Sequence, residues 1–216
     1  MKPLTISLLA LVAIASALSA QGPWKTLFNG KDLSGWSVSA PRPGEAPAPW
    51  KVENGVLVGG QGAGRGSLNS DEKFKDFELE LEFMLAEHET YNSGVYFRTG
   101  YEVNIGRRES GEFIGLVVRR VAPGAIGPQG NILWLDKGDE KFSGLRKQDA
   151  WNALRIVSKG PHIEVYLNGT KVSSVDDNPT DPAEATKEAG PIGFQWPSAG
   201  GFAGSVKYRQ IRIRPL

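Results

Sequence analysis

The densest group of polar side chains in the sequence lies near the middle of the chain. If Val95 and Phe97 point into an apolar core, alternation along a strand places Tyr96 and Arg98 on the opposite face. The strand expected to follow carries Glu102 on that same face. A phenol, a guanidinium and a carboxylate gathered on one sheet surface can supply a proton donor, a positive charge and a general base.

Two amides extend this group, Asn92 before it and Asn104 after it. A hairpin turning at Thr99-Gly100 would bring Arg98 and Glu102 within reach of each other. The simpler interpretation is an ordinary cross-strand Arg–Glu pair on a solvated face, where such a pair contributes little stability. Residue types and spacing alone leave both interpretations open.

Alternating apolar and polar residues predict the strands that must position this group. In the segment from Phe77 to Phe83, Phe and Leu share one face and three Glu share the other. We expect the Glu face to be a solvated outer surface, with a concave cleft as the alternative. The pairs Asn168-Gly169 and Asn54-Gly55 suit the positive φ values of tight turns and predict hairpins over 163–172 and 50–58.

Further strands are expected between loops rich in Gly and Pro, of which the 216 residues contain 27 and 14. These strands are expected at 94–98, 101–105, 112–119, 131–135, 153–158, 190–195 and 206–214. With helix scarce, the pattern predicts an all-β fold, a sandwich of two packed antiparallel sheets. The residues expected to be buried between the sheets are Phe77, Leu79, Leu81, Phe83, Val95, Phe97, Val103, Val165 and Leu167.

Residues 1–20 have the pattern of a signal peptide. Lys2 supplies the positive start, residues 6–14 form a short apolar run, and Ala17 and Ala20 end small-residue cleavage sites. We therefore expect residues 21–216 to be one exported domain, periplasmic or secreted, with no membrane insertion after signal cleavage. An uncleaved anchor is the alternative, disfavoured because polar residues follow Ala20 at once.

Composition argues against several classes of partner and cofactor. The chain has 25 Lys and Arg against 24 Asp and Glu, and removal of Lys2 with the signal makes the two sets equal. No electrostatic footprint for nucleic acid follows from that balance. Cys is absent, so stability must come from the core. His88 and His162 are too few for a His-rich metal site, which leaves a hard divalent cation on Glu102, Asn104 and carbonyls as the cofactor to consider.

A series of short motifs runs through the predicted domain, from Leu27-Phe28-Asn29-Gly30-Lys31-Asp32-Leu33-Ser34-Gly35-Trp36 to Tyr208-Arg209-Gln210-Ile211-Arg212-Ile213. Between them lie Trp50-Lys51-Val52-Glu53-Asn54-Gly55-Val56-Leu57, Asp76-Phe77-Glu78-Leu79-Glu80-Leu81-Glu82-Phe83, Asn92-Ser93-Gly94-Val95-Tyr96-Phe97-Arg98, Trp151-Asn152, Tyr166-Leu167-Asn168-Gly169 and Gly190-Pro191-Ile192-Gly193-Phe194-Gln195. In this order they resemble the 3-keto-disaccharide hydrolase domain family of bacteria. The resemblance implies a concanavalin A-like jelly roll with a carbohydrate site on its concave sheet.

The resemblance also implies 3-keto-glycosides or 3-keto-disaccharides as substrates. A ketone at C3 acidifies the hydrogen on C2, so that a base can remove it and the glycosidic oxygen at C1 can leave, after which water adds back. For this chemistry Glu102 is the expected base, Arg98 the partner of the enolate oxygen and Tyr96 the donor to the leaving oxygen. The expected substrate-binding residues are Asn92, Asn104, Gln195 and Trp196.

Trp196 is expected to stack on a sugar from a loop at the border of the cleft, although core packing is the commoner role of any one Trp. The sequence departs from the family pattern here, because Trp196-Pro197-Ser198 stands where many members carry a His. It departs again at Glu102-Val103-Asn104, where many members read Glu-x-Gln. The first departure puts any His-dependent chemistry in doubt.

Two other classes of function fit a β-sandwich, because the fold alone does not determine activity. A non-catalytic carbohydrate-binding module is the main alternative, and both the missing His and the six Trp residues favour it. A structural or interaction domain of the cell envelope is the third interpretation. That interpretation does not explain why the sequence carries Glu102 and Arg98 in this polar group.

We predict that the exported chain begins after Ala17 or Ala20, because the signal pattern ends at small residues suited to cleavage. Mass spectrometry of the protein recovered beyond the inner membrane gives its N-terminus directly. An exported chain that still carries Met1 would show that the segment is not a cleaved signal.

Overall fold

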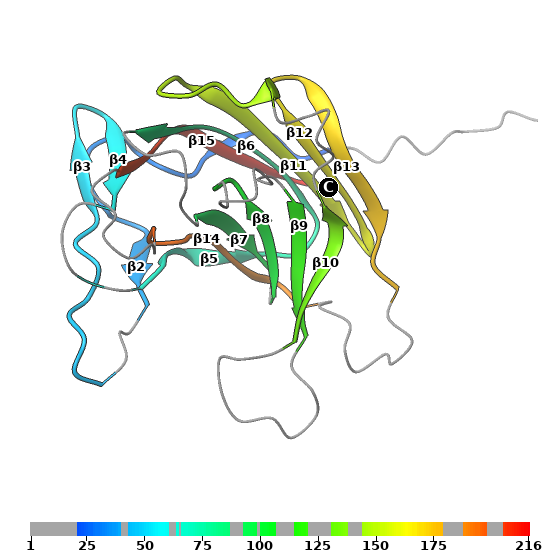
Figure 1. Ribbon diagram of the computed structural model, residues 1–216, viewed down its shortest axis with the longest axis horizontal. Helices are drawn as coiled ribbons and strands as arrows, with labels where there is room; N and C mark the ends of the chain where they lie inside the picture. Colours follow the sequence, from blue (N-terminus) through cyan, green and yellow to red (C-terminus); the bar gives the residue numbers. More distant parts are fainter. Residues whose placement is uncertain are drawn as a thin grey trace, which may run out of the picture.

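The computed structural model describes residues 21–39, 43–60, 64, 66–86, 93–98, 100–106, 115–120, 131–137, 144–178, 188–197 and 205–216. Two antiparallel sheets pack face to face, which confirms the predicted all-β sandwich (Figure 1). The part of the chain that the structure describes contains no helix able to cross a membrane.

Each sheet is built from strands distant in sequence. Sheet A contains, in spatial order, β13 (Thr170–Asp176), β12 (His162–Leu167), β11 (Asn152–Lys159), β6 (Phe77–Ala86), β15 (Ser205–Pro215), β4 (Val56–Gly59) and β3 (Lys51–Glu53), with β1 (Lys25–Thr26) paired to β15. Sheet B contains β10 (Asn131–Lys137), β9 (Gly115–Arg120), β8 (Tyr101–Asn104), β7 (Gly94–Phe97), β14 (Gly190–Phe194), β5 (Leu68–Phe74) and β2 (Trp36–Val38). In Figure 1 sheet A forms the upper layer and sheet B the lower one.

The core lies between the sheets and contains every residue predicted for it. All nine side chains of that set are at most 3% exposed, as period-2 spacing requires. The two predicted hairpins are also confirmed. Asn168 and Gly169 join β12 to β13 with φ values of 49° and 83°, and Asn54 and Gly55 join β3 to β4 with 50° and 82°. Asn and Gly tolerate these left-handed conformations, so the turns fix the register of both hairpins.

The three Glu of β6 lie on the outer surface of sheet A, as expected, and each meets an Arg of a neighbouring strand. Arg212 Nε is 2.8 Å from Glu80 Oε2, and Arg209 Nε is 2.6 Å from Glu82 Oε2. Glu78 is shared by two guanidinium groups, those of Arg155 and Arg214. Burial raises the pKa of Glu78, but hydrogen bonds from the two Arg side chains outweigh it, so the pKa lies below its ordinary value.

We predict that Glu78→Gln lowers the free energy of unfolding by about 2 kcal/mol, because two partly buried guanidinium groups lose one carboxylate. Urea denaturation measures the loss. The matched control is Glu80→Gln on the same strand and face, where the pair with the half-exposed Arg212 should contribute less than about 1 kcal/mol.

The loss of stability in Glu78→Gln should also depend on pH. A carboxylate with a lowered pKa in the folded state stabilises the fold above the ordinary pKa of Glu and loses that contribution as pH falls. The stabilities of the wild type and Glu78→Gln should therefore converge in acid. Equal losses for the two Glu variants at neutral pH would contradict a special role for Glu78.

Candidate functional site

Strands β7 and β8 place two predicted site residues side by side on the outer face of sheet B. Val95 pairs with Val103, and both are fully buried in the core. Tyr96 pairs directly with Glu102, so their side chains share the opposite face. Glu102 is nevertheless only 3% exposed, so the carboxylate is buried on a face that is not the apolar core.

Gly94 gives the Glu102 carboxylate room to lie flat on the sheet. A Cβ atom at Gly94 would clash with Oε1, Cγ and Cδ of Glu102. One strand further, a Cβ at Gly193 would lie 2.5 Å from Asn69 Oδ1. Glycine therefore leaves space over β7 and β14 for a carboxylate and an amide to lie against the backbone.

Two predicted binding residues flank Gly94. Asn104 is its partner on β8, and the Asn104 Oδ1 atom accepts a hydrogen bond from the Gly106 amide at 3.0 Å. On the other side the Gln195 amide donates to the Gly94 carbonyl at 2.9 Å. Because Phe194 is buried in the core, alternation turns the Gln195 side chain to the outer face. Its Oε1 atom is buried and accepts no hydrogen bond from the residues that the structure describes.

The structure thus brings Tyr96, Glu102, Asn104 and Gln195 together on one face. Asn92, also predicted here, lies outside the described residues. Asn69 joins the group without having been predicted. Its strand, β5, has a polar sequence without clear alternation, so no pattern indicated which way Asn69 would point.

Arg98 does not lie beside Glu102, and that prediction is wrong. Arg98 has a φ of 50°, a left-handed conformation that ends the alternation of β7. Its side chain is 5% exposed and turns toward sheet A, where Nη1 donates to the Gly160 carbonyl at 2.6 Å and lies 3.4 Å from Ser158 Oγ. The guanidinium also lies over the ring of Tyr101, with its carbon 5.6 Å from the ring centroid. Arg98 therefore joins the two sheets and does not face the outer surface of sheet B.

Trp196 packs in the core, so its predicted place at the border of a cleft is wrong. It is 7% exposed and meets Trp50 edge to face, with ring centroids 5.4 Å apart. The alternation that turns Gln195 outward turns Trp196 inward. Trp151 is partly exposed, but the Arg209 guanidinium covers its ring at 4.0 Å from the centroid.

Among the described residues no group of three or more His, Asp and Glu side chains is arranged to hold a metal ion. His162 begins β12, the strand next to the edge strand β13 of sheet A, and its Nδ1 lies 2.7 Å from Asp176 Oδ1. That hydrogen bond raises the pKa of His162, with a smaller contribution from Glu164. His88 lies outside the described residues.

Two facing antiparallel sheets with these connections form a jelly roll, a fold shared with glycan-cleaving enzymes and carbohydrate-binding modules. A putative glycosyl hydrolase from Parabacteroides distasonis is 26% identical over 90% of this chain and 100% of its own, with a TM-score of 0.59. β-Agarase A from Zobellia galactanivorans is 15% identical, with coverage of 89% and 92% and a TM-score of 0.59. The carbohydrate-binding module CBM66 from Bacillus subtilis is 12% identical, with coverage of 82% and 94% and a TM-score of 0.57.

The chain belongs to the 3-keto-alpha-glucoside-1,2-lyase-like domain family, whose sequence model matches residues 23–214. This confirms the family and the jelly-roll class predicted from the motifs. No curated protein sequence matches the chain significantly.

We predict that Arg98→Met lowers the free energy of unfolding by about 2 kcal/mol, because the partly buried Gly160 carbonyl loses a charge-assisted hydrogen bond from the buried Arg98 side chain. Chemical denaturation measures this change. Lys159→Met, which removes an exposed cation from β11, is the matched control and should change stability by less than about 0.5 kcal/mol. If Arg98→Met unfolds with the stability of the wild type, the bond to Gly160 does not hold the sheets together.

Proposed function

We propose that this chain is an exported enzyme that cleaves 3-keto-glycosides or 3-keto-disaccharides on the outer face of sheet B. The observation that carries the proposal is the Glu102 carboxylate, buried at 3% exposure and lying against Gly94 outside the apolar core. Family membership supports the substrate class, and the pattern of residues 1–20 supports export.

In the proposed reaction Glu102 takes the proton from C2 of the 3-keto sugar. The C1–O bond then breaks to give a double bond between C1 and C2, and the leaving oxygen takes a proton from Tyr96, the direct cross-strand partner of Glu102. Glu102 then returns its proton to C2 while water adds its oxygen to C1 as a hydroxyl, and the remaining proton of that water goes back to Tyr96. The net result is hydrolysis of the glycosidic bond.

The enolate oxygen on C3 needs a donor other than Arg98, which faces the opposite sheet. Side-chain amides of Gln195 and Asn104 flank Gly94, and an amide N–H can donate to a developing oxyanion. The buried Gln195 Oε1 can in turn accept a sugar hydroxyl. A divalent cation on Glu102 and Asn104 would serve the same purpose as the amides, and a chelator tests it.

The carboxylates of sheet A are poor alternatives as the base. Glu78, Glu80 and Glu82 each lie in an ion pair with Arg, and the pKa of Glu78 is lowered. A carboxylate stabilised as its anion is a weaker proton acceptor.

A carbohydrate-binding module is the second candidate function. The specific observation in its favour is the stretch after Gln195, where many members of the family carry a His and this chain has Trp196, which packs into the core. Such a module would bind the same sugars without turning them over, so an activity assay separates the two functions.

We predict that Glu102→Gln lowers turnover by about 10²-fold or more while substrate binding survives, because the amide keeps the size and polarity of the side chain but cannot accept the proton. The assay measures release of 3-keto-glucose from a 3-keto-disaccharide, with and without chelator. Glu80→Gln on sheet A is the matched control and should retain activity.

Two results would decide against the proposal. No turnover by the wild type on any 3-keto-glycoside, with binding intact, would favour the binding module. Full turnover by Glu102→Gln, with a fold shown intact by denaturation, would reject Glu102 as the base.

A further inference from the structure

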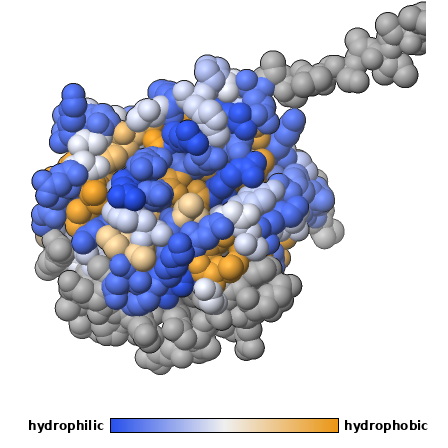
Figure 2. All heavy atoms as spheres, turned by 90° about the horizontal axis from the view of Figure 1, so that it is seen from above, coloured by the Kyte–Doolittle hydropathy of each residue, from blue (hydrophilic) through white to orange (hydrophobic). Residues whose placement is uncertain are grey.

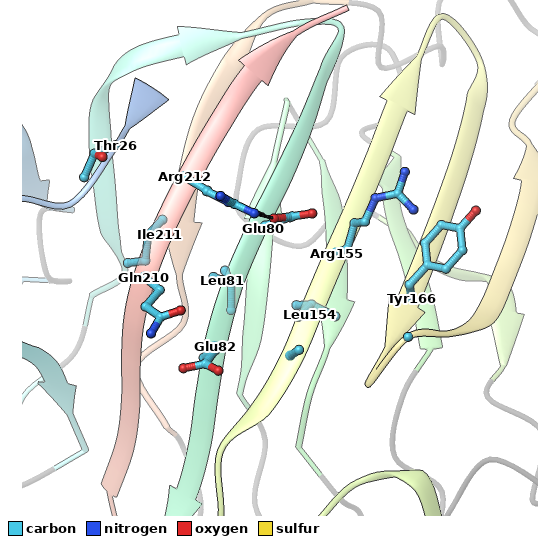
Figure 3. A pocket seen from close by; sticks show the side chains of 12 residues that line it. Thr26, Glu80, Leu81, Glu82, Leu154, Arg155, Tyr166, Gln210, Ile211 and Arg212 are labelled. Atoms are coloured by element: carbon cyan, nitrogen blue, oxygen red, sulfur yellow. Dashed lines mark hydrogen bonds and ion pairs between the residues drawn. The ribbon is translucent and has the colours of Figure 1, made fainter. Parts of the chain in front are cut away.

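A groove crosses the outer face of sheet A, on the side of the molecule opposite to Glu102. It has a volume of about 630 Å³, and its lining comes from β1, β6, β11, β12, β15 and the turn after β12 (Figure 3). Arg212, Glu80, Arg155 and Tyr166 form one side of it, as successive cross-strand partners on four neighbouring strands. Seen from above, this face of the molecule is mostly hydrophilic, with apolar residues between the charged ones (Figure 2).

Small side chains and a β-bulge form the hollow beside the four cross-strand partners that run from Arg212 to Tyr166. Ala153 is exposed where it pairs with Glu82, and Gly169 lies at the tip of the hairpin. On β15 the register shifts between Arg209 and Arg212, and Gln210 has a φ of 53°. The bulge adds one residue to the outer face of β15. Gln210 therefore reaches the groove between Arg209 and Arg212, which both face outward.

The polar groups of the groove are held in place yet keep capacity for further hydrogen bonds. Arg212 donates twice to Oε2 of Glu80, and Arg209 donates to Oε2 of Glu82. Among the bonds described, the Oε1 atoms of both Glu accept none, and the exposed Gln210 amide takes part in none. Side chains fixed by ion pairs lose little further freedom when a ligand binds.

These features select a class of ligand. Two Glu and two Arg line the groove, so its formal charge is zero and neither a polyanion nor a polycation is attracted over the other. Its Leu and Ile members, Leu81, Leu154 and Ile211, are at most 3% exposed, so none of the three offers a side chain on which a hydrophobic peptide could pack. A neutral, hydroxyl-rich ligand can both donate to the free carboxylate oxygens and accept from the amide and guanidinium groups.

We propose that this groove binds a neutral oligosaccharide, as a second glycan site separate from the one on sheet B. From β15 to β12 the groove crosses three inter-strand spacings, roughly 14 Å. That length suits several linked sugars. The site needs no 3-keto group, because no residue in it is placed to act as a base.

Binding of unoxidised oligosaccharides tests the site without turnover. The probes are cellohexaose, maltohexaose and agarohexaose, with hexagalacturonate and a sulfated heparin hexasaccharide as anionic counterparts. Calorimetry gives the affinity, and amide chemical shifts of Ala153, Gly169 and Gln210 show where the sugar binds. At least one neutral probe should bind and shift these amides, and Glu102→Gln should bind it equally well. The result is thus independent of the proposed catalysis.

Ala153→Trp fills the hollow without removing an ion pair and should weaken binding at least tenfold. Gln210→Gly keeps the left-handed bulge, removes the amide and should also weaken it. Ser174→Trp is the matched control, an exposed uncharged residue on β13 of the same sheet, and should bind like the wild type. Failure of all neutral probes, preference for an anionic probe, or unchanged affinity in Ala153→Trp would each overturn the proposal.

Discussion

Burial of apolar side chains between the two sheets is the constraint on which the rest of this structure depends. Side chains alternate along a strand, so each residue committed to the core commits its neighbours to an outer face. Leu79 and Leu81 thereby fix Glu80 outward on sheet A, and Val103 fixes Glu102 outward on sheet B. A shift of register by one residue would expose these core side chains, at a cost of about 2 kcal/mol for each one. Polar side chains such as Glu80 and Glu102 are therefore held on defined faces by the burial of their apolar neighbours.

The alternation fails at two non-glycine residues with positive φ, and each failure has a consequence. At Arg98 the chain leaves β7, and the side chain turns inward to the Gly160 carbonyl on the opposite sheet. At Gln210 the extra residue of a bulge turns outward and widens the surface of sheet A. A left-handed residue costs roughly 1–2 kcal/mol. At Arg98 a charge-assisted hydrogen bond of similar strength offsets that cost, whereas at Gln210 the pairing of the long strand on either side holds the bulge in place.

Sequence reasoning succeeded where alternation was regular and failed where polar residues entered the core. The nine predicted core residues and the face carrying Tyr96 and Glu102 followed from Val and Phe spacing alone. Strand β5 was missed because its inward residue Ser70 is polar: it is 4% exposed and accepts a hydrogen bond from the Ile192 amide. The inward turn of Arg98 could not be predicted, since its acceptor lies 62 residues away. The inward place of Trp196 was missed in the same way, since its edge-to-face partner Trp50 lies in a distant part of the chain.

One sequence pattern, Glu alternating with apolar residues, gives two different chemistries according to the neighbouring strands. On β6 the neighbours supply Arg at every Glu, so each of these carboxylates lies in an ion pair. On β8 the neighbouring strand β7 supplies a phenol and a glycine, Tyr96 and Gly94, and the Glu102 side chain lies against the bare backbone at Gly94. The place of a strand in its sheet, more than residue type, thus separates a structural carboxylate from a candidate base. The two faces are also separated by both sheets, which pack roughly 10 Å apart. A short sugar bound on one face cannot touch the other, and only a glycan long enough to pass around a sheet edge could occupy both.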